Sequence, residues 1–367
     1  MKTTRIIFTG GFLGAGKTTL LWEAAGRLTK KGLRVGLITN DQAPELVDTA
    51  LLSRQGLAVA EVSGSCFCCN FNGLTEAMER VNAGTEADVI MAEPVGSCTD
   101  LSATIMQPLK QDWHHRFSVA PLSVLADPAR LLPILDGETA GLHGDAAYIF
   151  RKQLEESDII LVTKTDTLEA HALASLLGRV REAFPSATAL PVSALSGEGM
   201  DEWLANVLER TDAGRRIAVV DYDVYARGEA VLGWLNGTVR LTAFVGTGDL
   251  DAFMNAFLTR LAERLDGRGY GVGHVKAILE NGSRYVAGNL TGNVRTLSLR
   301  GSVGMGHTAK LTVNARVETS PEKLDALVRE VLDETTHGCY EMTVLAWRCL
   351  QPGRPNPTYR YAQVVAL

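Results

Sequence analysis

The sequence has few cysteines, no long apolar run and no excess of basic residues. Six cysteines in 367 residues are far too few for a disulfide scaffold. No segment approaches the roughly 18 consecutive apolar residues that a membrane-spanning helix requires. The first apolar stretch ends at Phe8 in a glycine-rich turn, so we expect no signal peptide. These absences predict a soluble cytoplasmic protein with free thiols and no membrane partner.

Charge and composition exclude further classes of protein. The formal net charge is −6, whereas a general nucleic-acid binder normally carries a basic surface, so we expect no nucleic-acid partner. Hydrophobic residues make up 46% and charged residues 21%, which excludes disorder, collagen and coiled coil for the chain as a whole. The length exceeds the roughly 250–300 residues at which a single core stops growing, so two domains are expected.

Short apolar runs alternate with helical patterns in the first two-thirds of the chain. Most of these runs are apolar throughout and rich in β-branched residues, which is typical of parallel strands covered on both faces. The pattern predicts an α/β domain, a doubly wound and mostly parallel sheet, over residues 1–212. The expected strands are 5–9, 34–39, 58–62, 88–92, 118–126, 159–162 and 189–192, and the clearest helices are 18–28, 170–183 and 201–208.

The last third changes character. Residues 213–237 have a mixed composition and are expected to link two domains. Beyond them, 239–245 and 310–317 alternate apolar and polar residues as half-buried strands do, and each is followed by a helical pattern. This repeated plan predicts a second, smaller α+β domain over 238–367, of the ferredoxin-like type.

Residues 11–18 read GFLGAGKT and match the phosphate-binding pattern G-x-x-x-x-G-K-[ST] between a strand and a helix. In this pattern the Lys17 ammonium reaches the β- and γ-phosphates, and the Thr18 hydroxyl binds Mg²⁺. An ordinary glycine-rich turn is the alternative, but it would not require the strand, motif and helix to be in register. The residues expected to surround the phosphates are Gly11, Gly14, Ala15, Gly16, Lys17, Thr18 and Thr19.

Two carboxylates end expected strands. Asp41 and Glu93 are candidates for ordering Mg²⁺ and the attacking water, because ligands of open α/β sheets bind beyond the strand carboxyl ends. A loop or capping role is the alternative for each. Gly96 follows Glu93 closely and is expected to offer a backbone N–H to the γ-phosphate.

Residues 163–166 read TKTD and approximate the N-K-x-D signature that selects guanine. The Asp166 carboxylate can accept two hydrogen bonds from guanine, a donor pair that adenine lacks, and the Lys164 stem can pack over the base. Ser193 and Ala194 resemble the loop that touches the guanine O6. Thr163 stands where Asn is usual, so a polar strand end in an ATPase remains an alternative.

Half of the cysteines lie within four residues, as Cys66, Cys68 and Cys69. Thiolates suit Zn²⁺, Co²⁺ and other thiophilic transition metals, but three cannot complete a tetrahedral site. Possible sources of the fourth ligand are Cys98, in the loop after Glu93, Glu61, a histidine, water or a partner protein. Buried structural cysteines or a redox pair are the alternatives that the spacing leaves open. No histidine is expected to be a primary ligand.

Together, these motifs closely resemble those of the CobW-type metallochaperone GTPases, relatives of the urease and hydrogenase nickel-insertion GTPases. Residues Asn40, Asp41, Glu45 and Asp48 also resemble that family's first switch segment. The resemblance covers roughly residues 5–210. It implies a GTP hydrolase that couples its cycle to delivery of a transition metal, with Cys66, Cys68 and Cys69 as the CxCC-motif ligands. The client would be a metalloprotein or a cofactor-assembly protein.

Several positions depart from the family pattern. Ser65 is an insertion before the cysteines, Pro94 replaces the usual Thr after Glu93, and the histidine-rich tract of many relatives is missing. We therefore keep two alternatives: a regulatory GTP-binding module with structural or redox cysteines, and a P-loop ATPase that reactivates a corrinoid or other metalloprotein. No built-in arginine finger is evident, so a homodimer or a client complex is expected to assist hydrolysis.

Overall fold

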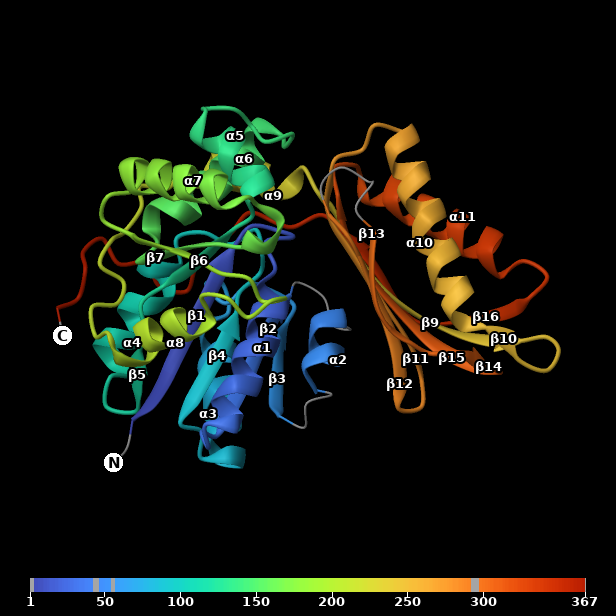
Figure 1. Cartoon of the computed structure of the whole chain (residues 1–367), viewed down its shortest axis with the longest axis horizontal. Coiled ribbons are helices and arrows are strands. Elements are labelled where there is room, and N and C mark those ends of the chain that lie inside the picture. The colour runs from blue at the N-terminus through green and yellow to red at the C-terminus, as the bar shows by residue number, and fades with distance from the viewer. Residues whose placement is uncertain (1–2, 42–45, 54–56, 292–296, 367) are drawn as a thin grey trace. The chain divides into compact units, whose positions relative to one another are not determined.

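The computed structural model describes residues 3–41, 46–53, 57–291 and 297–366 (Figure 1). The chain divides into two compact units. The N-terminal unit comprises Met1–Gln42, Leu51–Gly228 and Arg354–Leu367, and the C-terminal unit comprises Ala43–Ala50 and Glu229–Gly353. Within the described ranges, every helix is too short or too polar to cross a bilayer.

A parallel sheet forms the centre of the N-terminal unit. Its strands are arranged in the order β3-β2-β4-β1-β6-β7-β8, and β5 pairs with the first half of β1. The order reverses direction on either side of β1, which defines a doubly wound sheet and confirms the predicted fold class. The strands are β1 (Thr4–Gly11), β2 (Val35–Asp41), β3 (Ala58–Ser63), β4 (Val89–Glu93), β5 (Phe117–Val119), β6 (Ser123–Ala126), β7 (Ile159–Val162) and β8 (Thr188–Pro191).

Helices cover both faces of this sheet. Successive residues of the central strands point to opposite faces, and all of them are therefore buried. Ile7 packs with helices α1 and α8 in one core, while its neighbours Ile6 and Phe8 are equally buried on the other side. The helices are α1 (Lys17–Lys30), α2 (Val47–Ser53), α3 (Phe71–Thr85), α4 (Gln107–Asp112), α5 (Pro128–Leu135), α6 (Gly144–Glu156), α7 (Ala170–Ala183), α8 (Met200–Glu209) and α9 (Tyr222–Ala230), with a π-helix, η1 (Ser102–Met106), before α4 and a 3₁₀ turn, η2 (Thr165–Thr167), after β7.

Two segments differ from the sequence-based expectation. The single strand expected over 118–126 is two strands, β5 and β6, which pair with different parts of β1. Pro121 lies between them and has no N–H to continue the ladder. The segment 213–237, expected to be a linker, contains α9 and the start of β9. The backbone N–H groups of Gly214 and Arg215 are held by the buried carboxylate of Asp158 at 2.7 and 3.0 Å.

The C-terminal unit is an antiparallel sheet in the order β13-β12-β11-β15-β9-β16, with helices α10 and α11 packed on it. The units β9-α10-β11 and β15-α11-β16 interleave, which is the split β-α-β arrangement of ferredoxin-like folds. The elements are β9 (Gly233–Ala243), β10 (Gly248–Asp249), α10 (Leu250–Gly267), β11 (Val272–Asn281), β12 (Arg284–Leu290), β13 (Leu297–Ser302), β14 (Met305–Gly306), β15 (Thr308–Val317), α11 (Pro321–Thr336) and β16 (Tyr340–Leu350).

Local signals define the start of α11. The Ser320 side chain accepts a hydrogen bond from the Lys323 N–H, and Pro321 occupies the first turn, where its missing N–H costs nothing.

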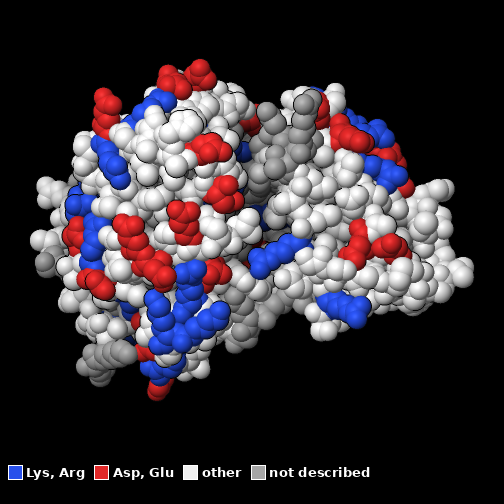
Figure 2. Space-filling view, viewed as in Figure 1, with Lys and Arg blue, Asp and Glu red and all other residues white. Residues whose placement is uncertain are grey.

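Acidic and basic side chains are interspersed on the face of the molecule shown in Figure 2, in keeping with the near balance of charges in the sequence.

Candidate functional site

The chemistry-bearing residues gather at one edge of the N-terminal sheet, because the carboxyl ends of parallel strands meet there. The strand β1 leads into the glycine-rich loop, and β2 and β4 end at Asp41 and Glu93. The loops after β3, β7 and β8 carry the cysteines, the TKTD motif and Ser193. Motifs separated by more than one hundred residues thus share one edge.

The glycine-rich loop has the backbone that the phosphate-binding motif predicts. Gly14 and Gly16 have φ of 80° and 94°, in the left-handed region that favours glycine. A Cβ on Gly11 would lie 2.5 Å from the Leu125 carbonyl oxygen, so no other residue fits. The Lys17 ammonium folds back over the loop and donates to the Gly11 carbonyl at 2.8 Å.

Thr18 and Glu93 lie together, as a shared Mg²⁺ site requires. The Thr18 hydroxyl donates to the Glu93 carboxylate at 3.0 and 3.2 Å, and both side chains are buried. Asp41 is also buried, two residues after Thr39, which pairs with Glu93 between β2 and β4. Hydroxyl and carboxylate oxygens are ligands that Mg²⁺ prefers, so this donor set fits the ion.

The loop after Glu93 passes directly over the glycine-rich loop. A Cβ on Gly96 would lie 3.0 Å from the Lys17 nitrogen and 2.6 Å from the Leu13 side chain. The buried Gln153 amide holds this loop from α6, donating to the carbonyls of Gly96 at 3.0 Å and Cys98 at 2.7 Å. Nothing in the sequence around Gln153 signals this role.

The loops after β7 and β8 meet as the guanine-site interpretation requires. The Ser193 hydroxyl donates to the Asp166 carboxylate at 2.5 Å, and Ala194 is the next residue. The Asp166 side chain is otherwise open to solvent. Lys164 pairs with Asp127, which precedes α5. No sequence motif marks this acidic partner of the lysine.

Thr163 braces the phosphate loop despite replacing the usual Asn. Its hydroxyl donates to the Ala15 carbonyl at 3.0 Å, and both residues are buried. Arg130 of α5 supports the same loop from outside, donating to the Leu13 carbonyl at 2.8 Å and lying 5.4 Å from the centre of the Phe12 ring. A cation therefore does lie beside this loop, although no sequence motif signals one.

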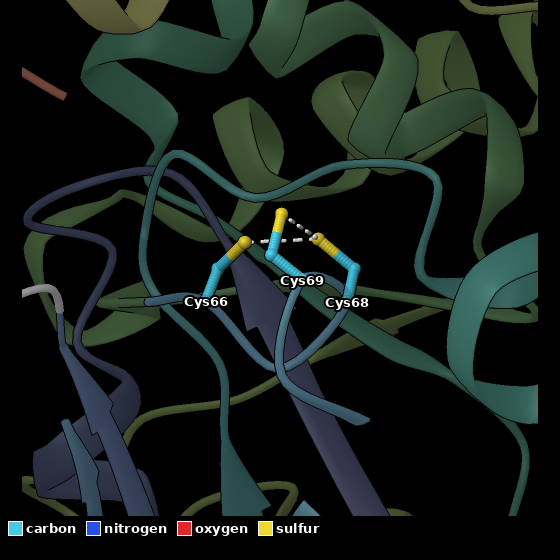
Figure 3. A group of neighbouring side chains, drawn as sticks. All are labelled: Cys66, Cys68 and Cys69. Carbon is cyan, nitrogen blue, oxygen red and sulfur yellow. Dashed lines mark hydrogen bonds between the residues drawn. The ribbon is translucent and has the colours of Figure 1, made fainter. Parts of the chain in front are cut away.

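The three cysteine sulfurs converge, as Figure 3 shows. All three lie within 4.8 Å of one another, and the Cys68–Cys69 separation is 3.8 Å. A tetrahedral Zn²⁺ with bonds of about 2.3 Å places its sulfurs about 3.8 Å apart. Cys66 and Cys68, at 2.9 Å, would separate by about 1 Å to take the same ion. The group suits a soft metal.

The thiols differ in their ease of ionisation. Hydrogen bonds from Cys68, Cys69 and Cys98 hold the pKa of Cys66 well below its usual range. The same bond to Cys66 raises the pKa of Cys68, and the Cys66 interaction raises that of Cys69 to about 11. One thiolate therefore forms readily, whereas ionising the others requires a neighbouring cation.

Cys98 lies beside this group, as expected for a possible fourth ligand. Its side chain is 1% exposed and interacts with the thiols of both Cys66 and Cys68. It belongs to the loop over the glycine-rich motif, so the cysteines and the phosphate site share that loop. Among the described residues, the cysteine triplet is the one cluster of metal-ligating side chains that the geometry brings together, and it contains no histidine.

Asn40 fixes the turn that carries the cysteines, residues 65–70 (the cysteine turn), to the end of β2. Its amide nitrogen donates to the Val62 and Ser65 carbonyls, each at 2.8 Å, and its amide oxygen accepts from the Phe67 N–H at 2.8 Å. Asn40 immediately precedes Asp41, one of the candidate Mg²⁺ residues. The resemblance to the family placed Asn40 in an expected switch segment, but the sequence did not indicate that the Asn40 side chain holds the cysteine turn in place.

The two other residues of the expected switch segment are Glu45 and Asp48. Glu45 lies outside the described residues. Asp48, in α2, pairs with Lys276 of β11 at 2.6 Å, and the Val47 N–H donates to the Asn314 side chain of β15 at 2.8 Å. The start of α2 is therefore bound to the sheet of the C-terminal unit.

Comparisons with known proteins identify relatives of this chain. The chain is 25% identical over 188 residues to "Zinc chaperone YjiA" of Escherichia coli (strain K12), covering 50% of this chain and 57% of that protein. It is 27% identical over 222 residues to "Zinc chaperone CobW" of Pseudomonas aeruginosa, covering 51% and 56%. The chain thus spans little more than half the length of these relatives.

A solved structure of HypB from Helicobacter pylori in complex with nickel superposes with a TM-score of 0.43 at 15% identity, covering 60% of this chain and 92% of that one. The sequence profile described as "CobW/HypB/UreG, nucleotide-binding domain" matches residues 5–191, which is 187 of the 367 residues. This protein therefore belongs to the CobW/HypB/UreG family.

Proposed function

We propose that this protein is a Mg²⁺-dependent GTPase that acts as a metallochaperone, loading and releasing a thiophilic transition metal at its cysteine turn. The observation that carries the proposal is the attachment of this turn to the nucleotide edge. Asn40 holds the turn from the end of β2, and Cys98 reaches it from the loop over Lys17. A change at the phosphates therefore has two short routes to the metal ligands.

On the nucleotide side, Lys17 would exchange its loop carbonyl for the β- and γ-phosphates, and Gly96 would offer its N–H to the γ-phosphate. Thr18, Asp41 and Glu93 would hold Mg²⁺, which supplies charge neutralisation at the phosphates. The closeness of the Thr18 hydroxyl to Glu93 supports this assignment. Asp41 and Glu93 would also orient the attacking water.

For the base, Asp166 would accept the two guanine donors while Ser193 holds its carboxylate in place. Ala194 and the Lys164 stem would line the base. We expect Asp166→Ala to weaken GTP binding by at least roughly 10–100-fold, because each hydrogen bond to a charged group contributes about 1.5–3 kcal/mol and the substitution removes two. An ATP preference, insensitive to this substitution, would instead support the ATPase-reactivator alternative.

The cargo metal would bind Cys66, Cys68 and Cys69, with Cys98 as fourth thiolate. The relatives named as zinc chaperones and the sulfur geometry favour Zn²⁺, and Co²⁺ accepts the same tetrahedral thiolate site. Cys98 belongs to the loop that carries Gly96, so its position would respond to the nucleotide. Cys98→Ala should then reduce the difference in metal affinity between the GTP-bound and GDP-bound states.

The decisive experiment measures Zn²⁺ and Co²⁺ affinity by competition with a chromophoric chelator under reducing conditions, with a GTP analogue and with GDP. The triple variant Cys66→Ala/Cys68→Ala/Cys69→Ala is compared with Cys339→Ala, a matched loss of an exposed cysteine in the C-terminal unit. Tight, nucleotide-dependent binding that only the triple variant loses would support the metallochaperone. Equal affinities in all variants would favour the regulatory module with structural or redox cysteines.

Hydrolysis is expected to be slow in the isolated protein and faster in a homodimer or a complex with the client metalloprotein. Arg130 is already engaged with the glycine-rich loop and one aromatic ring, so stabilisation of transition-state charge would come from a partner. Gel filtration with a non-hydrolysable GTP analogue and Zn²⁺ tests the homodimer. A monomer under all these conditions would leave the client complex as the activating state.

A further inference from the structure

A segment that follows the C-terminal sheet belongs to the N-terminal unit and contacts the cysteine turn. Residues Arg354–Leu367 belong to the N-terminal unit, although β16, which ends at Leu350, belongs to the other. We call residues 354–361 the strap. It reads RPNPTYRY, and prolines on both sides of Asn356 favour an extended backbone.

The strap bonds directly to two of the cysteines. The Asn356 N–H donates to the Cys69 sulfur at 3.2 Å. The Thr358 N–H donates to the Cys68 carbonyl at 2.8 Å, and the Thr358 hydroxyl donates to the Cys69 carbonyl at 3.3 Å. Cys69 is the most exposed thiol of the three, so the strap lies at the side of the cluster that opens toward solvent.

Further contacts anchor the strap on either side of this point. The Tyr359 ring packs edge-on against Phe71, with ring centres 5.2 Å apart, at the start of α3. The Arg360 guanidinium donates to the Asp100 carboxylate at 2.7 Å. Asp100 is 0% exposed and lies two residues after Cys98, in the loop that passes over the phosphate motif. The strap therefore joins both loops that carry cysteines.

We infer that the strap is a positioning segment of the metal site: it orients the Cys69 sulfur as a ligand through the Asn356 N–H and limits access to it. This inference rests on the proposed metal site. Outer-shell hydrogen bonds to metal ligands typically change metal affinity by 10–100-fold. Release of the strap would expose Cys69 and promote metal transfer.

The key variant is Asn356→Pro, which removes only the N–H because a third proline keeps the extended backbone. Its matched control is Asn356→Ala, which alters an exposed side chain and keeps the N–H. In the full chain, we expect Asn356→Pro to weaken Zn²⁺ binding about tenfold, and to shift the sulfur-to-Co²⁺ charge-transfer band of the Co²⁺-loaded protein, while Asn356→Ala matches the wild type. Equal affinities and spectra for both variants would overturn the ligand-positioning role.

A second measurement needs no metal. The rate of Cys69 alkylation by iodoacetamide, followed by peptide mass spectrometry, is compared in the wild type, in Thr358→Val/Tyr359→Ala and in the control Thr358→Ser. We expect about fivefold faster alkylation in the double variant alone, since it loses the hydroxyl bond and the ring contact. Unchanged rates would overturn the limit on access. If neither the wild type nor the variants bind Zn²⁺ through the cysteines, the proposed function fails and ligand positioning fails with it. The alkylation rates still decide whether the strap covers Cys69.

Discussion

Single residues with several partners tie the loops of the site together. Asn40, Gln153 and Asp100 each bridge segments distant in sequence, and each is buried. A buried polar group left without its partner costs about 1–3 kcal/mol, so these residues constrain the loops more strongly than exposed ion pairs do. At this scale the site is a set of short polar bridges.

Asn40 is the clearest case. Asn40→Ala removes three hydrogen bonds from the cysteine turn and leaves the Phe67 N–H without its acceptor. We expect Zn²⁺ affinity to fall about tenfold, because the substitution frees the backbone that positions the cysteines. Chelator competition checks this, with Asn72→Ala, an exposed position in the first turn of α3, as the control. An unaffected Asn40→Ala would show that the turn holds its own shape.

Glu156 predicts a pH dependence of folding stability. Burial is the main reason that the pKa of Glu156 rises from 4.5 to about 8, and nearby Asp100 adds to the rise. The folded protein therefore keeps a proton that the unfolded chain releases above pH 4.5. Its contribution to stability is full below that pH and is lost as the pH rises through about 8.

Glu156→Gln imitates the protonated acid and should remove this dependence. We expect the variant to exceed the wild type in unfolding free energy at pH 8, by on the order of 2–4 kcal/mol, and to differ little at pH 4.5. Urea unfolding at both pH values measures the difference. The interpretation fails if the two proteins lose stability in parallel between these pH values.

At the scale of elements, local patterns predicted most strands of the N-terminal sheet and several helices, but not their long-range contacts. The α7 helix begins and ends at the expected residues, and the glycine-rich motif joins β1 to α1 as expected. Both predictions were possible because their signals are local in the sequence. In contrast, Asn40 meets residues 22 to 27 positions away, and the strap meets the cysteines 287 positions away. No periodicity or motif encodes such pairs, since they depend on the completed fold.

Helix α2 is attached to the C-terminal sheet through Asp48 and Lys276, whose side chains are mostly buried. We expect Asp48→Asn and Lys276→Met each to destabilise this attachment by about 1–3 kcal/mol, and the double variant to cost less than their sum. Amide hydrogen exchange of residues 46–53 gives the readout.

Lys310→Met is the control for this pair, because Lys310 of β15 makes a more exposed ion pair with Glu280 of β11 and should leave exchange in α2 unchanged. If the effects of Asp48→Asn and Lys276→Met add fully, the two side chains do not act as a pair.

At the scale of the whole molecule, the sequence gives no sign that each compact unit is built from discontinuous segments. Residues 43–50 cluster with the C-terminal unit, and residues 354–367 cluster with the N-terminal unit. Composition and periodicity reveal where elements begin, but not to which core a short segment returns. Chemistry explains the return of one segment: the buried Asp100 carboxylate needs a cation, and Arg360 of the final segment supplies it.

Truncation tests this organisation. A chain ending at Gly353 leaves Asp100 without Arg360 and frees the carbonyls of Cys68 and Ala103. We expect a loss of roughly 1–3 kcal/mol in the stability of the N-terminal unit, discounted because Arg360 is partly exposed. A chain ending at Tyr361 keeps these contacts and should unfold like the wild type in thermal denaturation. Equal melting of all three chains would mean that the tail adds nothing to the core.

The return of residues 354–361 to the cysteine turn also limits how such a protein can evolve by exchanging parts. A recombination event that swapped everything after Gly228 for the corresponding half of a relative would replace the C-terminal sheet and, with it, the residue that neutralises Asp100 and the N–H that contacts Cys69. The new C-terminal sheet would arrive with a foreign tail. Viable hybrids should therefore have three segments rather than two, with the original final residues restored behind the donor sheet.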